Sequence, residues 1–171
     1  MNNKTIITQV IYFVLYIIFQ VFFAKNLELF NVAFCFVYIN FILNLPQDSK
    51  SEMVLFSGFL LGFIVDSFYN TWGIHSAACV FIAFIRPFVL KVVTPKNAGD
   101  DNDLKEKSLL RFSLYAIILI FIHHSIIFFI EIAHFKLFFR TLVKIFFSTI
   151  FTFVLSVIIQ YLSPRKATKQ A

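Results

Sequence analysis

Charged side chains are scarce in this sequence. Asp, Glu, Lys and Arg together make up 14% of its 171 residues, whereas 60% of the residues are hydrophobic. Soluble domains carry about 25% charged residues, and a water-soluble fold with so few would expose apolar patches large enough to aggregate. The composition therefore excludes a soluble domain and indicates a protein whose solvent is lipid.

Signatures of catalysis are also missing. The chain has no phosphate-binding glycine loop, no Gly-x-Ser-x-Gly elbow and no paired-carboxylate constellation of the kind that acid–base catalysis uses. The histidines and the acid near the end of one hydrophobic run (His123, Glu131 and His134) do not match the His-Glu-x-x-His metal pattern. The two cysteines, Cys35 and Cys79, lie within hydrophobic runs, where we expect them to be buried as small apolar side chains. We therefore predict no enzyme activity, no cofactor and no metal site.

What the chain does contain is six hydrophobic runs of membrane length. A helix needs about 20 apolar residues to cross ~30 Å of hydrocarbon, and the runs cover residues 6–24, 27–45, 52–68, 74–93, 112–133 and 137–162. We predict a single all-α, polytopic transmembrane domain over residues 1–171 with about six transmembrane helices. Five spans, or a re-entrant third segment, also fit. A polar loop is expected at 94–111, within which Asp103 can cap one helical turn.

The orientation follows from the distribution of Lys and Arg, which favour cytoplasmic connections. With the N-terminus inside, ten lie in inner segments and four in outer ones, so we predict a multi-pass membrane protein with cytoplasmic N- and C-termini. The inner ten are Lys4, Lys50, Lys91, Lys96, Lys105, Lys107, Arg111, Arg165, Lys166 and Lys169, and the outer four are Lys25, Lys136, Arg140 and Lys144.

A few polar residues lie inside the predicted spans. Arg86 is close to Lys91, so we expect its side chain to reach the cytoplasmic interface. Asn40 and Asn44 are one turn apart and are expected to form hydrogen bonds across helices. For His123 we expect a polar contact with another helix.

A stripe of small and acidic residues marks the third run. Gly58, Gly62 and Asp66 recur every four residues, which places them within an arc of about 80° at ~100° per residue. Two glycines at this spacing allow another backbone to approach closely, and a carboxylate in a membrane span is costly unless it faces protein or water. Two interpretations remain open. The stripe is either a packing groove that ends in an interfacial acid, or a latch in which Asp66 accepts hydrogen bonds from the following turn or a neighbouring helix.

The stripe belongs to a longer pattern, in which Gly58-x3-Gly62-x3-Asp66 is followed by a short aromatic and polar turn and then by Gly73-Ile74-His75-Ser76-Ala77. This pattern resembles the signature of the rod shape-determining protein MreD family over about residues 55–87, and the rest of the chain fits that family in length and hydropathy. The resemblance marks Gly58, Gly62, Asp66, Gly73 and His75 as the expected helix-packing or partner interface.

The resemblance implies a non-enzymatic subunit of the bacterial cell-elongation (rod) complex in the cytoplasmic, or inner, membrane. Such a subunit would bind the bitopic protein MreC and help to link MreB filaments to peptidoglycan synthesis by a RodA-type glycosyltransferase and a penicillin-binding protein, thereby controlling cell shape. It also implies a fold shared with the substrate-binding subunits of energy-coupling-factor transporters. The Phe-rich helices and the charged loop at 94–111 depart from the family.

The alternative is a vitamin-binding subunit of such a transporter. Those subunits carry an alanine-x3-alanine docking motif on the first helix, but residues 6–23 contain neither alanine nor glycine. Transporters also tend to have interrupted helices or internal repeats, and neither is evident in the sequence. We therefore expect no high-affinity vitamin among the ligands. The net charge of +6 reflects topology rather than a folded basic domain, so we expect no nucleic acid either.

Overall fold

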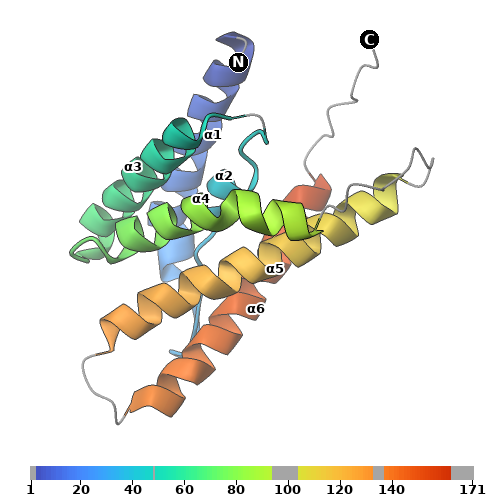
Figure 1. The fold of residues 1–171 in the computed structure, drawn as a ribbon. Helices are drawn as coiled ribbons and strands as arrows, with labels where there is room; N and C mark the ends of the chain where they lie inside the picture. Colours follow the sequence, from blue (N-terminus) through green and yellow to red (C-terminus); the bar gives the residue numbers. More distant parts are fainter. Residues whose placement is uncertain (1–2, 48, 94–103, 133–136, 163–171) are drawn as a thin grey trace.

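Five long helices dominate the computed structural model, which describes residues 3–47, 49–93, 104–132 and 137–162 (Figure 1). They are α1 (Asn3–Phe22), α3 (Ser51–Tyr69), α4 (Ile74–Val93), α5 (Leu104–Glu131) and α6 (Phe138–Leu162). All five contain a stretch long and apolar enough to cross a membrane. The chain is thus a mostly helical, multi-pass membrane protein.

The hydropathy pattern locates these five helices closely. The fourth run coincides with α4, and the first, third and sixth runs agree with α1, α3 and α6 within three residues at either end. The fifth run is part of a longer helix, because α5 begins at Leu104. The helical turn predicted after Asp103 is confirmed, but it continues into α5, so the loop predicted at 94–111 is helical over residues 104–111. Its first part, 94–103, lies outside the described residues.

The second run, residues 27–45, is not a continuous helix. After a short 3-10 turn, η1 (Ala24–Asn26), it forms a two-stranded antiparallel hairpin of β1 (Glu28–Leu29) and β2 (Ala33–Phe34). Residues 35–38 follow as an irregular connection that turns at Val37 and Tyr38, and α2 (Ile39–Leu43) is a helix of only five residues. Residues 33–38, which begin with β2, are called the extended segment below. The prediction of a transmembrane helix over 27–45 is wrong.

Local chemistry accounts for this conformation. Phe30 and Asn31 both have φ of 55°, and the N–H of Val32 donates to the carbonyl of Leu29 at 3.0 Å. Positive φ at both central residues is the geometry of the turn that suits a tight hairpin, and Asn tolerates it better than most residues. The residues that follow are rich in β-branched and aromatic side chains, which favour extended backbone.

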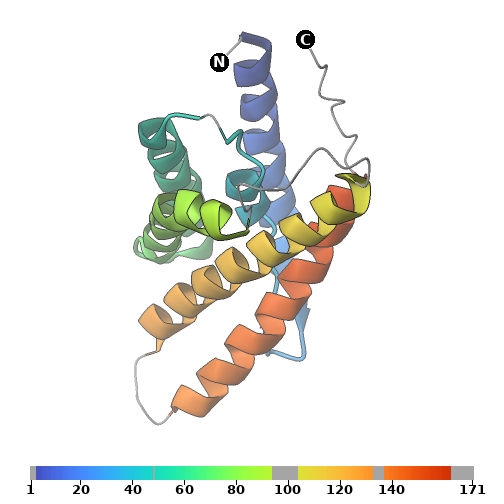
Figure 2. The same cartoon turned by 45° about the vertical axis from the view of Figure 1, so that its right-hand side comes forward.

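The irregular segment still returns the chain to the side from which α1 started. Figures 1 and 2 show the hairpin at one end of the molecule and the start of α3 toward the other, with α2 between them. The start of α1 and the end of α6 lie toward the same end in both views. A chain that crosses the membrane an even number of times must begin and end on the same side, as α1 and α6 do here (Figures 1 and 2). The count of six crossings, with one of them largely non-helical, remains a prediction.

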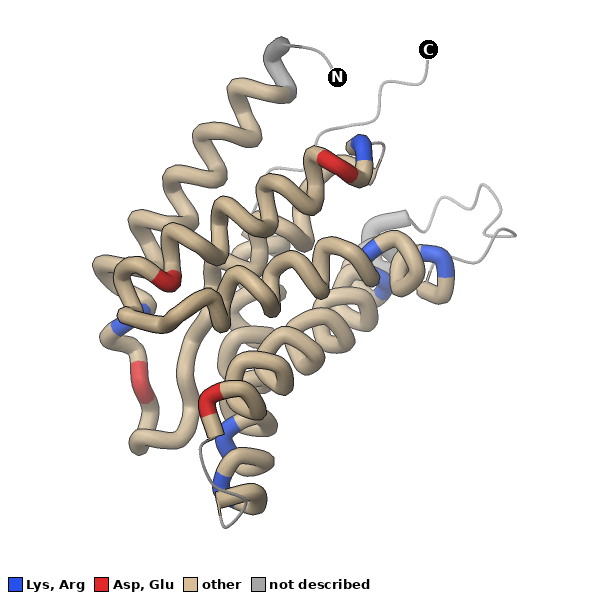
Figure 3. The backbone as a smooth tube through the Cα atoms, turned by 60° about the vertical axis from the view of Figure 1, so that its left-hand side comes forward, with Lys and Arg blue, Asp and Glu red and all other residues tan. Residues whose placement is uncertain are grey.

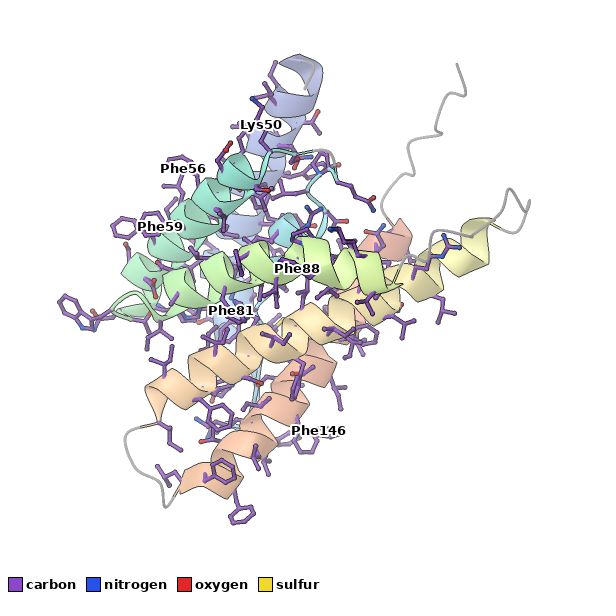
Figure 4. The ribbon with its side chains drawn as sticks, viewed as in Figure 1. Lys50, Phe56, Phe59, Phe81, Phe88 and Phe146 are labelled. Carbon is purple, nitrogen blue, oxygen red and sulfur yellow. The ribbon has the colours of Figure 1, made fainter. Side chains whose placement is uncertain are left out.

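The helices from α3 to α6 pack in chain order, so that each lies against the next, and α1 contacts α2 and α3. The extended segment runs between them, with β2 against α6. The central side chains, such as Tyr38, Ile82 and Leu119, are fully buried. Outward-facing positions are instead occupied by large apolar side chains, among them phenylalanines such as Phe56 and Phe146, which project away from the bundle (Figure 4). The charged residues gather near the ends of the elements (Figure 3).

Candidate functional site

The glycine stripe of α3 faces α4 of the same chain. A Cβ added at Gly62 would lie 2.4 Å from the Cα of Ser76 and 2.6 Å from the carbonyl oxygen of His75. A Cβ at Gly58 would lie 3.2 Å from the carbonyl oxygen of Cys79. The two backbones are therefore in direct contact at Gly62 and only slightly further apart at Gly58. The stripe is an internal packing surface, so it is not free to receive a partner.

Asp66 joins the end of α3 to the beginning of α4. Its Oδ1 accepts hydrogen bonds from the Thr71 hydroxyl (2.6 Å) and the His75 backbone N–H (2.9 Å). Its Oδ2 accepts from both the backbone N–H (2.9 Å) and the hydroxyl (2.6 Å) of Ser76. Of the two interpretations of the stripe, these bonds favour the latch, in which Asp66 accepts hydrogen bonds from the following turn and from a neighbouring helix. Because the first N–H groups of a helix lack partners within it and favour an anion, Asp66 serves as an N-terminal cap for α4 supplied from another helix.

The turn between α3 and α4 explains why the cap comes from a distance. Asn70 ends α3 in the left-handed conformation, with φ 55° and ψ 39°. Gly73, the residue before α4, has φ of 84°, where a side chain would be strained. A glycine at this place offers no side chain for capping, so the free N–H groups of His75 and Ser76 depend on Asp66.

The extended segment is held by side chains from the flanking helices. Gln20 of α1 donates to the carbonyl of Cys35 (3.0 Å) and accepts from the N–H of Tyr38 (3.3 Å). On the other side, Ser148 and Thr152 of α6 accept from the N–H groups of Phe34 (2.9 Å) and Phe36 (3.2 Å). Backbone groups buried in a membrane protein must be paired within the protein. These three polar side chains therefore allow a non-helical backbone to lie inside the bundle.

A cluster of aromatic and imidazole rings fills the centre beside this segment. The Tyr38 hydroxyl lies 2.7 Å from Nδ1 of His75 and 2.9 Å from Nε2 of His123, which links the extended segment to α4 and α5. All three residues are at most 2% exposed. The hydroxyl can donate to only one imidazole and must accept from the other. His123 thus makes the expected polar contact with another element, although that element is the extended segment rather than a helix.

His124 extends the cluster toward α6. Its Nδ1 lies 2.8 Å from the carbonyl of Ile120, and because a carbonyl can only accept, Nδ1 carries the proton. In the neutral ring Nε2 then accepts from the Thr152 hydroxyl at 3.2 Å. Thr152 therefore accepts from the backbone of the extended segment and donates to α5. In this way one hydroxyl connects three elements.

Arg86 is buried, which corrects the prediction that it reaches the interface. It is 4% exposed, its Nε donates to the Tyr115 hydroxyl at 3.0 Å, and its Nη2 donates to the carbonyl of Leu45. The carbonyl lies just after α2, where the end of the short helix leaves acceptors unpaired. The guanidinium therefore fixes the end of the irregular segment against α4 and α5.

The two asparagines also differ from expectation, because the hydrogen bonds that their side chains donate are local. Asn40 donates to the carbonyl of Val37 and Asn44 to that of Asn40, each at 3.0 Å. They stabilise the turns of the short α2 rather than joining two helices. The cysteines are buried and free, as predicted. His134, which follows the fifth hydrophobic run, lies outside the described residues.

An open apolar groove runs along the outer surface of α3 and α4, on the side away from the cluster. Its volume is about 1050 Å³, and it is lined by apolar side chains of both helices, four of them phenylalanines, together with Asp66 and residues of the turn. Phe59 and Phe81 face it and remain about half exposed (48% and 47%). They project from neighbouring helices in Figure 4. The groove is a feature that the sequence pattern alone did not reveal.

Sequence reasoning identified the stripe and its acid but missed the cluster. Tyr38 is separated by 37 residues from His75 and by 85 from His123, so no local spacing connects them. The signal that could have suggested it is the presence of several histidines and of Gln20 in apolar runs, because each such side chain needs a partner in lipid. Comparisons of the chain with protein-family models, curated proteins and solved structures gave no match.

Proposed function

We propose that this protein is a non-enzymatic membrane subunit of a bacterial cell-elongation complex, as the resemblance to the MreD family implies. One observation carries the proposal. The residues of the family-like pattern, which are spread over two helices and a turn, converge on a single contact, with Gly62 against the backbone of Ser76 and Asp66 on the N–H groups that follow Gly73. A chance collection of glycines and an acid would not be expected to form one structural unit.

The state of the buried polar groups favours a structural role over catalysis. Both carboxylate oxygens of Asp66 are occupied by donors of the same chain. The Tyr38 hydroxyl is shared between His75 and His123. A catalytic acid or base needs to reach a substrate proton within hydrogen-bonding distance. These groups are instead engaged in joining the elements to one another.

A second candidate is the substrate-binding subunit of an energy-coupling-factor transporter, and the interrupted crossing at 27–45 favours it. Unwound segments beside buried polar groups are typical of transporter binding sites. Against it, the rings of the central cluster fill their own space, since Phe36 contacts the rings of His75 and His124 at centroid distances of 5.2 Å. A vitamin that copurifies in a 1:1 ratio with the protein would favour this candidate over the elongation subunit.

Within the proposed function, we place the partner on the outer groove of α3 and α4. The glycine stripe is already used inside the chain, so a partner must bind elsewhere. The single span of an MreC-like protein has the apolar surface that the groove requires. In lipid, helices associate through close packing rather than through hydrophobic exclusion, so a concave surface between two helices offers more contact than a convex one.

Co-purification tests both parts of this proposal. The full chain is expressed with the MreC-like protein encoded by the same genome, extracted in mild detergent and isolated through a tag. We expect the partner to be recovered with the wild-type protein. Phe59→Ala together with Phe81→Ala should reduce its recovery, whereas Phe146→Ala, an outward-facing control on α6, should not. Absence of the partner from the wild-type sample would contradict the proposed function. Equal recovery with all variants would contradict only the groove.

A further inference from the structure

A second, smaller cavity lies where α5 ends and α6 begins. It encloses about 390 Å³, within the range of small-ligand sites. Unlike the outer groove, whose lining holds a single charged residue, it brings charges of both signs together, with Glu131 from α5 and Arg140 and Lys144 from α6, beside apolar side chains such as Phe128. Figure 3 shows acidic and basic positions next to each other at this end of the bundle. The net charge of the lining is +1, from two cations and one carboxylate.

The two cations are positioned but not neutralised. The Lys144 ammonium lies over the rings of Phe34 and Phe128, 5.1 and 5.9 Å from their centroids, an arrangement that attracts a cation. Arg140 precedes it by one turn, so both side chains lie on the same side of α6. In the part of the chain that the structure describes, neither side chain has a carboxylate within 4.0 Å.

The position of the cavity across the membrane fits a phospholipid headgroup. At ~1.5 Å per residue, Lys144 lies about 9 Å along the helix from Phe138, the first residue of α6. Headgroup regions occupy the outer ~5–7 Å on each side of the hydrocarbon. We take the start of α6 as the outer edge of the headgroup region, which places Arg140 at headgroup level and Lys144 near the boundary with the hydrocarbon. In the orientation predicted from the charge distribution, this is the side on which basic residues are disfavoured, so their concentration here calls for a specific role.

We propose that this cavity binds one phospholipid molecule, with its phosphate held by Arg140 and Lys144 and a hydrogen-bond donor of its headgroup, such as an ammonium, held by Glu131. The charges of the site and of phosphatidylethanolamine complement each other: two cations meet the phosphate and the carboxylate meets the ammonium. The apolar side of the cavity, with Phe128, meets the start of the acyl chains. The proposal is independent of the elongation function.

Native mass spectrometry of the full chain tests this assignment. The protein is purified in detergent, supplied with an equimolar mixture of phosphatidylethanolamine and phosphatidylcholine, and examined for retained lipid. We expect about one phosphatidylethanolamine per chain, with affinity lowered about tenfold or more in the Arg140→Gln, Lys144→Gln double variant, because each charge-assisted hydrogen bond is worth about that factor. Glu131→Gln should reduce the preference for ethanolamine over choline while phosphate binding persists.

Three controls make the result decisive. Lys91→Gln changes an exposed cation at the end of α4 and should retain the lipid like the wild type. Lys144→Arg keeps the charge and should also retain it, which separates loss of binding from loss of folding. An excess of inorganic phosphate should not displace the lipid. Equal retention by the wild type and the double variant, or displacement of the lipid by phosphate alone, would overturn the proposal.

Discussion

The contact between Gly62 and α4 leads to a quantitative prediction for a single methyl group. In Gly62→Ala, the new Cβ would lie 2.4 Å from the Cα of Ser76, against the 3.4 Å at which ordinary contact begins, a shortfall of 1.0 Å. The obstructing atoms belong to the backbone, so no side chain can rotate away. The two helices must separate by about that distance, and the hydrogen bonds of Asp66 to the start of α4 lengthen as they do.

The expected cost combines two effects. Overpacking of a well-packed interface costs about 1–3 kcal/mol, and weakening hydrogen bonds to a charged group removes part of about 1.5–3 kcal/mol for each. The higher helix propensity of alanine returns up to about 1 kcal/mol. We therefore expect Gly62→Ala to destabilise the protein by about 3 kcal/mol. In soluble domains of this length, 1 kcal/mol of stability corresponds to ~2–4 °C in the midpoint of thermal unfolding, so we expect this midpoint to fall by about 6–12 °C.

Gly58→Ala provides the matched control. Its Cβ would meet the carbonyl oxygen of Cys79 at 3.2 Å and the Cβ of Ala83 at 3.3 Å, so adjustments of a few tenths of an ångström suffice. We expect its stability to remain within about 1 kcal/mol of the wild type, since the gain in helix propensity offsets the tighter contact. Thermal unfolding in detergent, followed by size-exclusion chromatography after heating, measures both variants. Equal midpoints for Gly62→Ala and Gly58→Ala would refute the reasoning.

Three further predictions concern the buried polar groups and the topology. Thr152→Val removes the acceptor of a buried backbone N–H and should lower the free energy of unfolding by about 1–3 kcal/mol. Thr149→Val is the control and should be nearly neutral in the same assay, because the Thr149 hydroxyl has no hydrogen-bond partner among the described residues. A larger loss for Thr149→Val than for Thr152→Val would contradict the described role of α6. Asp66→Asn keeps the shape but loses the charge and half of its acceptors, so it should lower the midpoint, yet less than a leucine at Gly62; a wild-type midpoint would show that the cap contributes nothing. Reporter fusions at Gly99 and Ala171 should both give the cytoplasmic signal, and an outside signal at either position would overturn the predicted orientation.

Hydropathy alone was sufficient to locate the long helices in the sequence, because lipid imposes a minimum length on any apolar helix that crosses it. The bounds predicted for α4 agree with the structure at both ends, and those for α3 within one residue. The failure at 27–45 has a physical cause. A continuous apolar run is compatible with a helix or with a buried extended segment, and periodicity does not separate them. What decides between them is the presence of Gln20, Ser148 and Thr152 on other helices, which pair the backbone of the extended segment.

The candidate site was predictable to the extent that it is local. The spacing of Gly58, Gly62 and Asp66 on one helix already indicated a close contact and an acid that needs hydrogen-bond donors. That these donors include backbone N–H groups of α4 could not be predicted, because it depends on the geometry of the turn around Gly73. Arg86 illustrates the opposite case. Its nearness to the end of α4 suggested an exposed charge, whereas the unpaired carbonyl of Leu45, 41 residues earlier in the chain, holds it inside.

The proposed function is tested most directly by depletion of the protein in the organism that encodes it. If it is a subunit of the elongation complex, cells that lose it should become round or swollen and incorporate new peptidoglycan without the lateral pattern of elongation. Re-expression of the wild type should restore rods, whereas Gly62→Leu, which cannot form the contact between α3 and α4, should not. Depleted cells that keep their rod shape and their lateral peptidoglycan synthesis would contradict the account.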